Sequence, residues 1–279
     1  GVMTGTSAPV RPTLPDLLTR RPRRWRSLFL SDLHLGTSRG RPAEVVDFLA
    51  HAEAEHLFLV GDIFDGWTPR GRKGPLPDHR QLLSRLDRLA ADGVAITYVP
   101  GNHDSGFRKL AGQTLGPMQI AEETRHTLAD GRVMLVTHGD MADPLMSLGD
   151  PVAWIGGKAD IALRRMGRLM SRLASGQPCH GATWLDRQLI ALNTALHPRA
   201  AFAERLTTRA RHLGFDGVIC GHYHIPALTE LAGTTYANCG DWLDHFSAVT
   251  ETAEGRLGLV AWPRQQLAGQ PVPERHGRI

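Results

Sequence analysis

Short apolar runs alternate with amphipathic segments in the first third of the chain. The runs are rich in Leu, Val, Ile and aromatic residues, which predicts buried strands at 28–30, 57–60 and 94–99. Two helices are expected between them, one opened by Pro42 and one from about Asp78 to Asp92. Strands that alternate with helices in this way favour a parallel sheet.

The later apolar segments are expected to pair as hairpins. The pairs are 124–129 with 132–136, 225–231 with 234–237, and 246–250 with 257–262. Asp130-Gly131 lies in the first of these turns and is a strong signal for an antiparallel hairpin. We expect the last strands to close a second sheet.

Five of the apolar runs end in a polar cluster that contains Asp, Asn or His. The clusters are Ser31-Asp32-Leu33-His34, Gly61-Asp62-Ile63-Phe64-Asp65, Pro100-Gly101-Asn102-His103-Asp104, Thr137-His138-Gly139-Asp140 and Gly221-His222-Tyr223-His224. Loops at strand ends are where such scaffolds carry reactive groups. The five clusters are therefore expected to converge on one edge of a sheet.

Seven side chains of these clusters form the donor set of a site for two metal ions. They are the oxygen donors Asp32, Asp62 and Asn102 and the imidazoles of His34, His138, His222 and His224. This mixture suits manganese, iron or zinc better than magnesium or copper, and a single zinc would need only three or four donors. One His or Asp alone is usually a surface or core residue, whereas the whole set indicates a metal centre.

The five clusters, in this order, resemble the motifs of the calcineurin-like metallophosphoesterases. The resemblance implies an α/β fold, a four-layer αββα sandwich of two mixed sheets, with the metals at the carboxyl ends of the strands. It implies two ligand sets bridged by Asp62, namely Asp32, His34 and His224 for one metal, and Asn102, His138 and His222 for the other. His103 resembles the catalytic histidine of the family, and Asp65 matches the acid that hydrogen-bonds it.

The segment between the fourth and fifth clusters reads as mainly helical, which predicts a helical insert at about 141–214. An apolar stripe in its first long helix is accompanied by arginines, including Arg164 and Arg168. Such stripes usually face a core, and such arginines usually face solvent. Because the insert begins next to a predicted ligand, we expect it to cap the site, with a face suited to acyl chains and phosphates.

A loop after the second cluster is a further candidate for substrate contact. Residues 66–77 contain so many Gly and Pro residues that no regular element is expected. Trp67 and Arg70 are the predicted contacts there, with plain packing of the loop as the alternative.

The place of the insert and the block Gly240-Asp241-Trp242 resemble the UDP-2,3-diacylglucosamine pyrophosphatases of lipid A biosynthesis. Members of that group release UMP and 2,3-diacylglucosamine 1-phosphate, usually with manganese, at the cytoplasmic face of the inner membrane. His103 stands where their best-known members have Arg. Another phosphodiesterase or phosphatase, acting on a nucleotide or another lipid-linked diphosphate, is the main alternative; a nuclease and a metal-free scaffold are weaker ones.

Composition places the chain among globular proteins of the cytoplasm. The 279 residues are 42% hydrophobic and 22% charged, and no apolar run reaches the roughly 18 residues that a membrane span requires. Three Cys residues form no paired pattern, which favours a reducing compartment.

The basic run Arg20-Arg21-Pro22-Arg23-Arg24-Trp25-Arg26 dominates the charge distribution. It would attract an anionic membrane surface at roughly 1 kcal/mol per residue, or it is a solvated tail. No motif for specific nucleic-acid binding accompanies it. We therefore expect a basic extension at 1–26, a phosphoesterase domain at 27–262 and a tail at 263–279, with no prediction for the oligomeric state.

Overall fold

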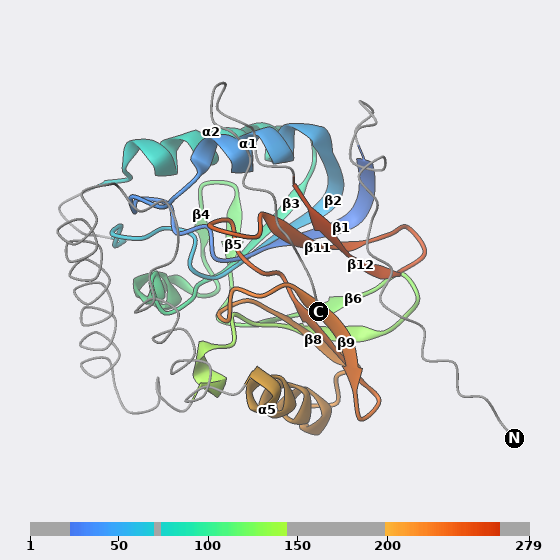
Figure 1. The fold of residues 1–279 in the computed structure, drawn as a ribbon. Coiled ribbons are helices and arrows are strands. Elements are labelled where there is room, and N and C mark those ends of the chain that lie inside the picture. The colour runs from blue at the N-terminus through green and yellow to red at the C-terminus, as the bar shows by residue number, and fades with distance from the viewer. Residues whose placement is uncertain (1–22, 70–73, 144–198, 263–279) are drawn as a thin grey trace, which may run out of the picture.

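The computed structural model describes residues 23–69, 74–143 and 199–262 of the chain (Figure 1). Within these ranges the protein forms two mixed sheets with helices on their outer faces.

The first sheet is built on three parallel strands, as the alternating pattern predicted. β1 pairs with β2 and β2 with β3, so that Leu28 lies opposite Leu57, and Leu57 opposite Ile96. The strand order is β12-β11-β1-β2-β3-β5-β4. The bounds are β1 Arg23–Leu30, β2 Ala52–Val60, β3 Ala95–Val99, β4 Thr114–Leu115, β5 Met118–Ile120, β11 Ser247–Glu251 and β12 Leu257–Ala261.

The second sheet has the order β6-β7-β8-β10-β9. Its bounds are β6 Thr124–Thr127, β7 Val133–Val136, β8 Gly217–Cys220, β9 Ala227–Leu231 and β10 Thr234–Asn238. The predicted hairpins β6–β7 and β9–β10 are confirmed as antiparallel pairs. β8 lies parallel to both β7 and β10, so this sheet is also mixed.

The helices make the outer layers of the sandwich (Figure 1). α1 (Pro42–His51) and α2 (Pro77–Ala91) pack on the first sheet, and α2 places Leu82 and Leu86 in its core. α5 (Arg199–His212) packs on β8 and β10 through Phe202 and Leu206. A third apolar cluster fills the space between the sheets, where the rings of Phe29 and Phe58 stack at 4.7 Å. The resulting order of layers is αββα.

The prediction that the last strands close the second sheet is wrong for β11 and β12. β11 pairs antiparallel with β1, and Val249 lies opposite Phe29 in the first sheet. The reason lies in the preceding segment, since Trp242 and Phe246 are buried in the core beneath α1. Burying these two large rings there brings the following strand, β11, beside β1 in the first sheet, where β12 then forms the edge.

Two predicted boundaries also change. β1 begins at Arg23, so the end of the predicted 1–26 extension is part of the sheet. α5 lies inside the predicted insert at 141–214, yet it forms a layer of the sandwich rather than a cap. Residues 144–198, the remainder of that insert, lie outside the described residues. The β4–β5 hairpin and the short helix η2 (Ser105–Leu110) were not predicted.

Candidate metal centre

The five polar clusters meet at the carboxyl ends of the strands, as predicted. Backbone hydrogen bonds join neighbouring loops: the amide of Asp32 donates to the carbonyl of Gly61, and the amide of His34 donates to the carbonyl of Asp62. The amide of His222 donates to Asp32 Oδ2 at 3.0 Å, which links a loop of the second sheet to a loop of the first. The site therefore spans both sheets.

Most of the predicted ligands have a left-handed backbone, which is unusual for residues other than glycine. The φ angles are +55° at Asp32, +45° at His34, +54° at Asp62, +68° at His222 and +59° at His224. Each such residue costs on the order of 1 kcal/mol or more, and the surrounding structure must compensate for it. Strain of this kind at residues other than glycine clusters at functional sites.

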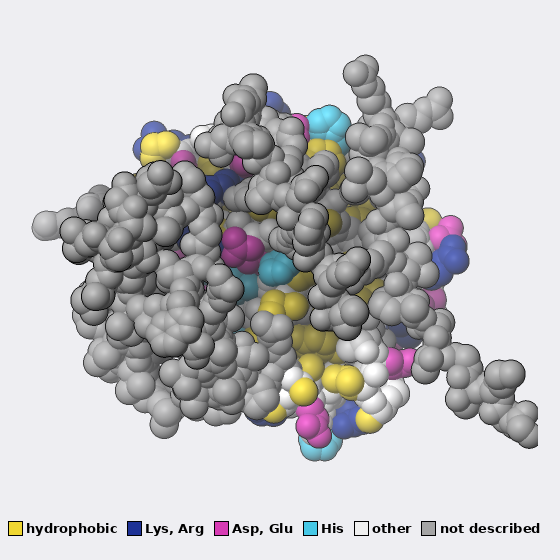
Figure 2. Space-filling model, viewed as in Figure 1, with side chains coloured by type: hydrophobic (Ala, Val, Ile, Leu, Met, Phe, Trp, Pro, Cys, Tyr) yellow, Lys and Arg dark blue, Asp and Glu magenta, His cyan; other side chains and the backbone are white. Residues whose placement is uncertain are grey.

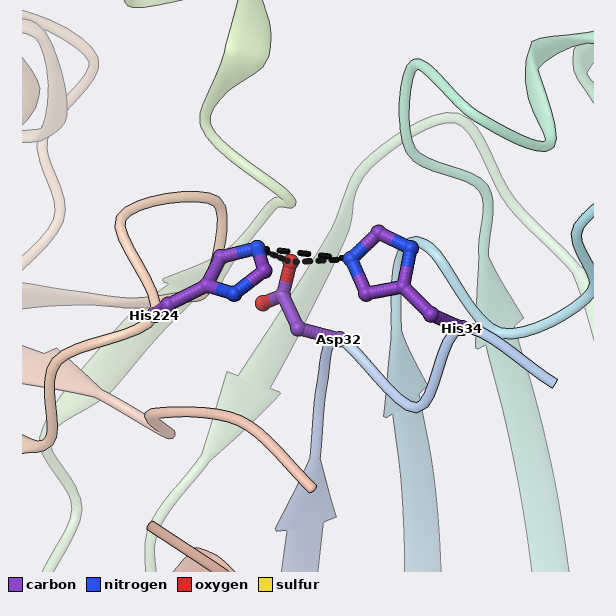
Figure 3. A group of neighbouring side chains, drawn as sticks. All are labelled: Asp32, His34 and His224. Carbon is purple, nitrogen blue, oxygen red and sulfur yellow. Dashed lines mark hydrogen bonds and ion pairs between the residues drawn. The ribbon is translucent and has the colours of Figure 1, made fainter. Parts of the chain in front are cut away.

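Asp32, His34 and His224 form the first group of donors (Figure 3). His224 Nε2 lies 3.1 Å from Asp32 Oδ1 and 3.3 Å from His34 Nε2. Ligand atoms that share an ion at about 2.0–2.2 Å are separated by roughly 3–3.5 Å, so this spacing fits a metal. Asp32 Oδ1 is buried and has no hydrogen-bond donor among the described residues. A cation between these three atoms would satisfy that oxygen.

Asp62 lies between this group and a second one. Its Oδ2 is 3.9 Å from His34 Nε2 and 3.5 Å from His138 Nε2, which is the place expected of a bridging carboxylate. Asn102 Oδ1 lies 3.3 Å from the same nitrogen of His138. Gly61 is required here, because a Cβ at this position would overlap the His138 ring.

The four predicted histidine ligands each have one ring nitrogen held by an acceptor. His138 Nδ1 donates to the carbonyl of Val60 at 3.0 Å, which leaves Nε2 as the nitrogen that can bind a metal. Carboxylates hold the other three rings. Asp65 contacts Nδ1 of His34, and Asp241 contacts Nδ1 of His224. Asp143 contacts Nε2 of His222. Such partners fix the tautomer and turn the remaining lone pair toward a metal.

Two of these partners were not recognised as such from the sequence. Asp241 belongs to the Gly240-Asp241-Trp242 block, whose role the sequence did not reveal, and Asp143 carried no signal at all. Both are buried, and their contact with a ligand exists only because distant loops meet.

The carboxylates and imidazoles of the site shift one another's pKa. Burial alone would raise the pKa of Asp32 and Asp62, but their histidine neighbours hold both below the usual value. Burial would likewise lower the pKa of His138 and His224, but the carboxylates of Asp62 and Asp32 raise each to about 10. Protons on the histidines thus balance the carboxylates, and a divalent cation would take their place.

His103 lies at the accessible side of the site, with half of its side chain exposed. Its Nδ1 is 3.1 Å from Asp65 Oδ2, as the resemblance implied, and this hydrogen bond raises the pKa of His103 to about 9. Its amide donates to Asp62 Oδ1 at 2.8 Å. Asp65 thus contacts both His103 and the predicted ligand His34.

Asp104 is a buried carboxylate that holds two ligand loops together. It accepts hydrogen bonds from the amides of Ile63 and Gly101 at 2.7 and 2.6 Å, and from the Tyr98 hydroxyl at 2.6 Å. These contacts fix Asp62 relative to Asn102. The sequence placed Asp104 in a cluster without assigning it a role.

The predicted substrate contacts are largely untested by the structure. The Trp67 ring is half-buried, stacks on His79 at 5.8 Å and meets Phe107 edge-on at 5.1 Å, so it packs against the first core. Arg70, Arg164 and Arg168 lie outside the described residues. Figure 2 shows His and acidic side chains near the middle of the face, with hydrophobic side chains beside them.

Comparison with known proteins gives one family and a consistent group of relatives. Residues 26–226 match the family described as "Calcineurin-like phosphoesterase". The chain is 35% identical to a UDP-2,3-diacylglucosamine hydrolase of Edwardsiella ictaluri, over 89% of this chain and 96% of the relative. It is 38% identical to a protein of the same name from Cellvibrio japonicus, over 85% of this chain and 98% of the relative.

Proposed function

Since this chain belongs to the calcineurin-like phosphoesterase family, we propose that it hydrolyses the pyrophosphate of UDP-2,3-diacylglucosamine, or of a close lipid-linked analogue. The products would be UMP and 2,3-diacylglucosamine 1-phosphate. Family membership and the names of the relatives make it a metal-dependent hydrolase. The number of ions, the metal and the lipid substrate belong to the proposal.

The arrangement of the seven predicted ligands supports two ions. Asp62 Oδ2 stands between His34 Nε2 and His138 Nε2, so one carboxylate can serve two positions. Asp32, His34 and His224 would hold one ion, and Asn102, His138 and His222 the other. The mixed oxygen and nitrogen donors favour manganese, with zinc or iron as alternatives.

Bound ions would lower the pKa of water and polarise the phosphoryl oxygens. The remaining steps are assigned to the protein. Asp65 holds His103 through Nδ1, which leaves Nε2 as the atom that can approach the leaving oxygen. His103 would stabilise charge there or donate a proton. Its exposed position allows this contact without movement of the ligands.

The substrate is inferred from the relatives. Both are named for UDP-2,3-diacylglucosamine, and alignment runs over almost their whole length. Among the described residues, no helix is long and apolar enough to cross a membrane. Peripheral contact with an anionic surface stays a prediction. Arg20, Arg21 and Pro22 of the basic run lie outside the described residues, and the rest of the run belongs to β1.

The test compares UDP-2,3-diacylglucosamine with bis(p-nitrophenyl) phosphate, using metal-stripped protein with and without manganese. We expect manganese-dependent release of UMP with a strong preference for the lipid. His103→Ala should keep its metal content and lose at least about a hundredfold in turnover, whereas Asp62→Ala should lose both. Cleavage of the simple diester alone would overturn the lipid assignment and leave the phosphoesterase class intact. If the wild type binds metal but cleaves neither compound, the proposed hydrolysis of UDP-2,3-diacylglucosamine is wrong.

A further inference from the structure

A largely buried ion pair lies beside the second group of predicted ligands. Arg108, in η2, places Nη2 2.7 Å from both carboxylate oxygens of Asp140. The same nitrogen lies 3.3 Å from the carbonyl of Pro100. The two side chains are only 20% and 6% exposed, so the contact is sheltered from solvent screening.

The pair connects the two loops that deliver Asn102 and His138. Pro100 precedes Asn102 by two residues, and Asp140 follows His138 by two. The donor atoms of these ligands, Asn102 Oδ1 and His138 Nε2, are 3.3 Å apart. One guanidinium therefore spans the same two loops that must hold those atoms together.

The turn at Gly139 directs Asp140 toward Arg108. Gly139 has φ of +105°, and a Cβ there would press against the ring of Phe202. Asp140 then begins the short helix η3 (Asp140–Ala142), whose last carbonyl accepts a hydrogen bond from Arg205 of α5 at 2.7 Å. The carboxylate is thus fixed from its own side and offers Arg108 a rigid partner.

The first group of ligands is supported differently. His34 and His224 each donate directly to a carboxylate, Asp65 and Asp241, and Ser31 Oγ lies 2.6 Å from Asp32 Oδ2. In the described part of the chain, Arg108 and Asp140 contact none of these three ligands. Loss of the ion pair should therefore weaken binding at the second metal position only.

Stability alone is a poor explanation for this pair. The Nε of Arg108 is buried and has no hydrogen-bond partner among the described residues. Buried ion pairs often contribute little net stability, and an incompletely paired guanidinium contributes less. Its geometry matches a role in holding two loops at a set separation.

We propose that Arg108 and Asp140 are positioning residues that hold Asn102 and His138 at the separation required by the second metal ion. This inference rests on the two-metal centre proposed above. Removing the arginine should weaken binding of the second ion by about tenfold, at the low end for residues that support metal ligands from behind. Binding of the first ion should change by less than about twofold.

The experiment titrates metal-free protein with Mn²⁺ and follows free Mn²⁺ by electron paramagnetic resonance, with bound metal counted by mass spectrometry. The variants are Arg108→Met, Arg108→Lys and Asp140→Asn. Arg132→Met is the matched control, since Arg132 pairs with Asp130 and contacts the carbonyl of Gly255 far from the ligand loops. Thermal unfolding of each metal-free variant separates loss of fold from loss of the site.

Wild type and Arg132→Met should bind two equivalents with the same affinities. Arg108→Met and Asp140→Asn should keep the first and bind the second about tenfold more weakly, with partial recovery in Arg108→Lys, which keeps the charge. Equal weakening of both ions, or no weakening, would overturn the inference while leaving the metal centre intact. A wild type that binds only one ion would overturn the proposed two-metal centre itself. If Arg108→Met does not fold, Asp140→Asn and Arg108→Lys decide the matter by the same criteria.

Discussion

Glu251 should contribute stability that disappears in acid. Its carboxylate is fully buried between the sheets, where it accepts hydrogen bonds from the Ser27 hydroxyl and the amide of Ala129 and lies 2.7 Å from His126 Nε2. The guanidinium of Arg26 forms an ion pair with Oε1 of Glu251. Burial alone would raise the pKa of Glu251, but these partners, led by His126, lower it from 4.5 to about 2. The network joins β1 and β11 of the first sheet to β6 of the second.

The size of the effect follows from the pKa. A carboxyl whose pKa falls from 4.5 to about 2 on folding contributes roughly 3 kcal/mol to the free energy of unfolding at neutral pH. Because the pKa is lower in the folded state, this contribution is complete above about pH 4.5. It is lost as the pH falls from about 4.5 toward 2.

Glu251→Gln keeps the shape of the side chain and removes the charge. We expect the variant to be less stable by about 3 kcal/mol at pH 7, which for a chain of this size is a fall of several degrees in Tm. The difference should shrink steadily below pH 4.5, since the wild type then becomes protonated at the same position.

The assay is urea unfolding of both proteins from pH 7 to pH 3, in the presence of a chelator so that metal binding does not contribute. Glu254→Gln is the matched control, because Glu254 is an exposed carboxylate in the turn that follows β11. A constant difference between wild type and Glu251→Gln over this range would refute the reasoning, since it would show that packing, and not the ionised carboxylate, is responsible.

Two further substitutions test the support of the metal centre. Asp241→Asn removes the charged partner of His224 Nδ1 and should lower metal affinity by about 10–100-fold. Asp244→Asn, at an exposed carboxylate nearby, is the control and should leave the affinity unchanged. Equal effects of the two variants in a Mn²⁺ titration would contradict this prediction. Tyr98→Phe removes a buried hydroxyl that donates to Asp104 and should cost about 1.5–3 kcal/mol in urea unfolding. A loss under about 0.5 kcal/mol would show that the backbone amides alone hold Asp104.

The location of the metal centre was predictable because it follows from local patterns. The runs at 28–30, 57–60 and 94–99 are apolar and short, so they had to be buried strands, and parallel strands place their carboxyl ends at one edge. Each polar cluster begins where its run stops. The convergence of Asp32, Asp62 and Asn102 therefore required no knowledge of the full tertiary structure.

The sheet to which β11 belongs was decided by tertiary packing. Its sequence is compatible with a place in either sheet, and the prediction of the second sheet was wrong. Trp242 and Phe246 bury their rings beneath α1, and that distant contact selects the partner β1. No local pattern around residues 247–251 contains this information.

The supporting residues of the site depend on tertiary structure for the same reason. Arg108 and Asp143 carry no signal in the sequence, and Asp140 belongs to a polar cluster without a role that the sequence reveals. Their partners are determined by which loops meet at the edge of the two sheets. The left-handed backbone at Asp32 and His222 could not be predicted from the sequence either, because that conformation is normally expected of glycine. Local hydrophobic patterning thus determined the strands and the polar clusters at their ends. The hydrogen-bond partners of the ligands and their left-handed backbone were decided by the tertiary structure. The physical reason is that they depend on contacts between residues far apart in the chain, which form only when the chain is folded.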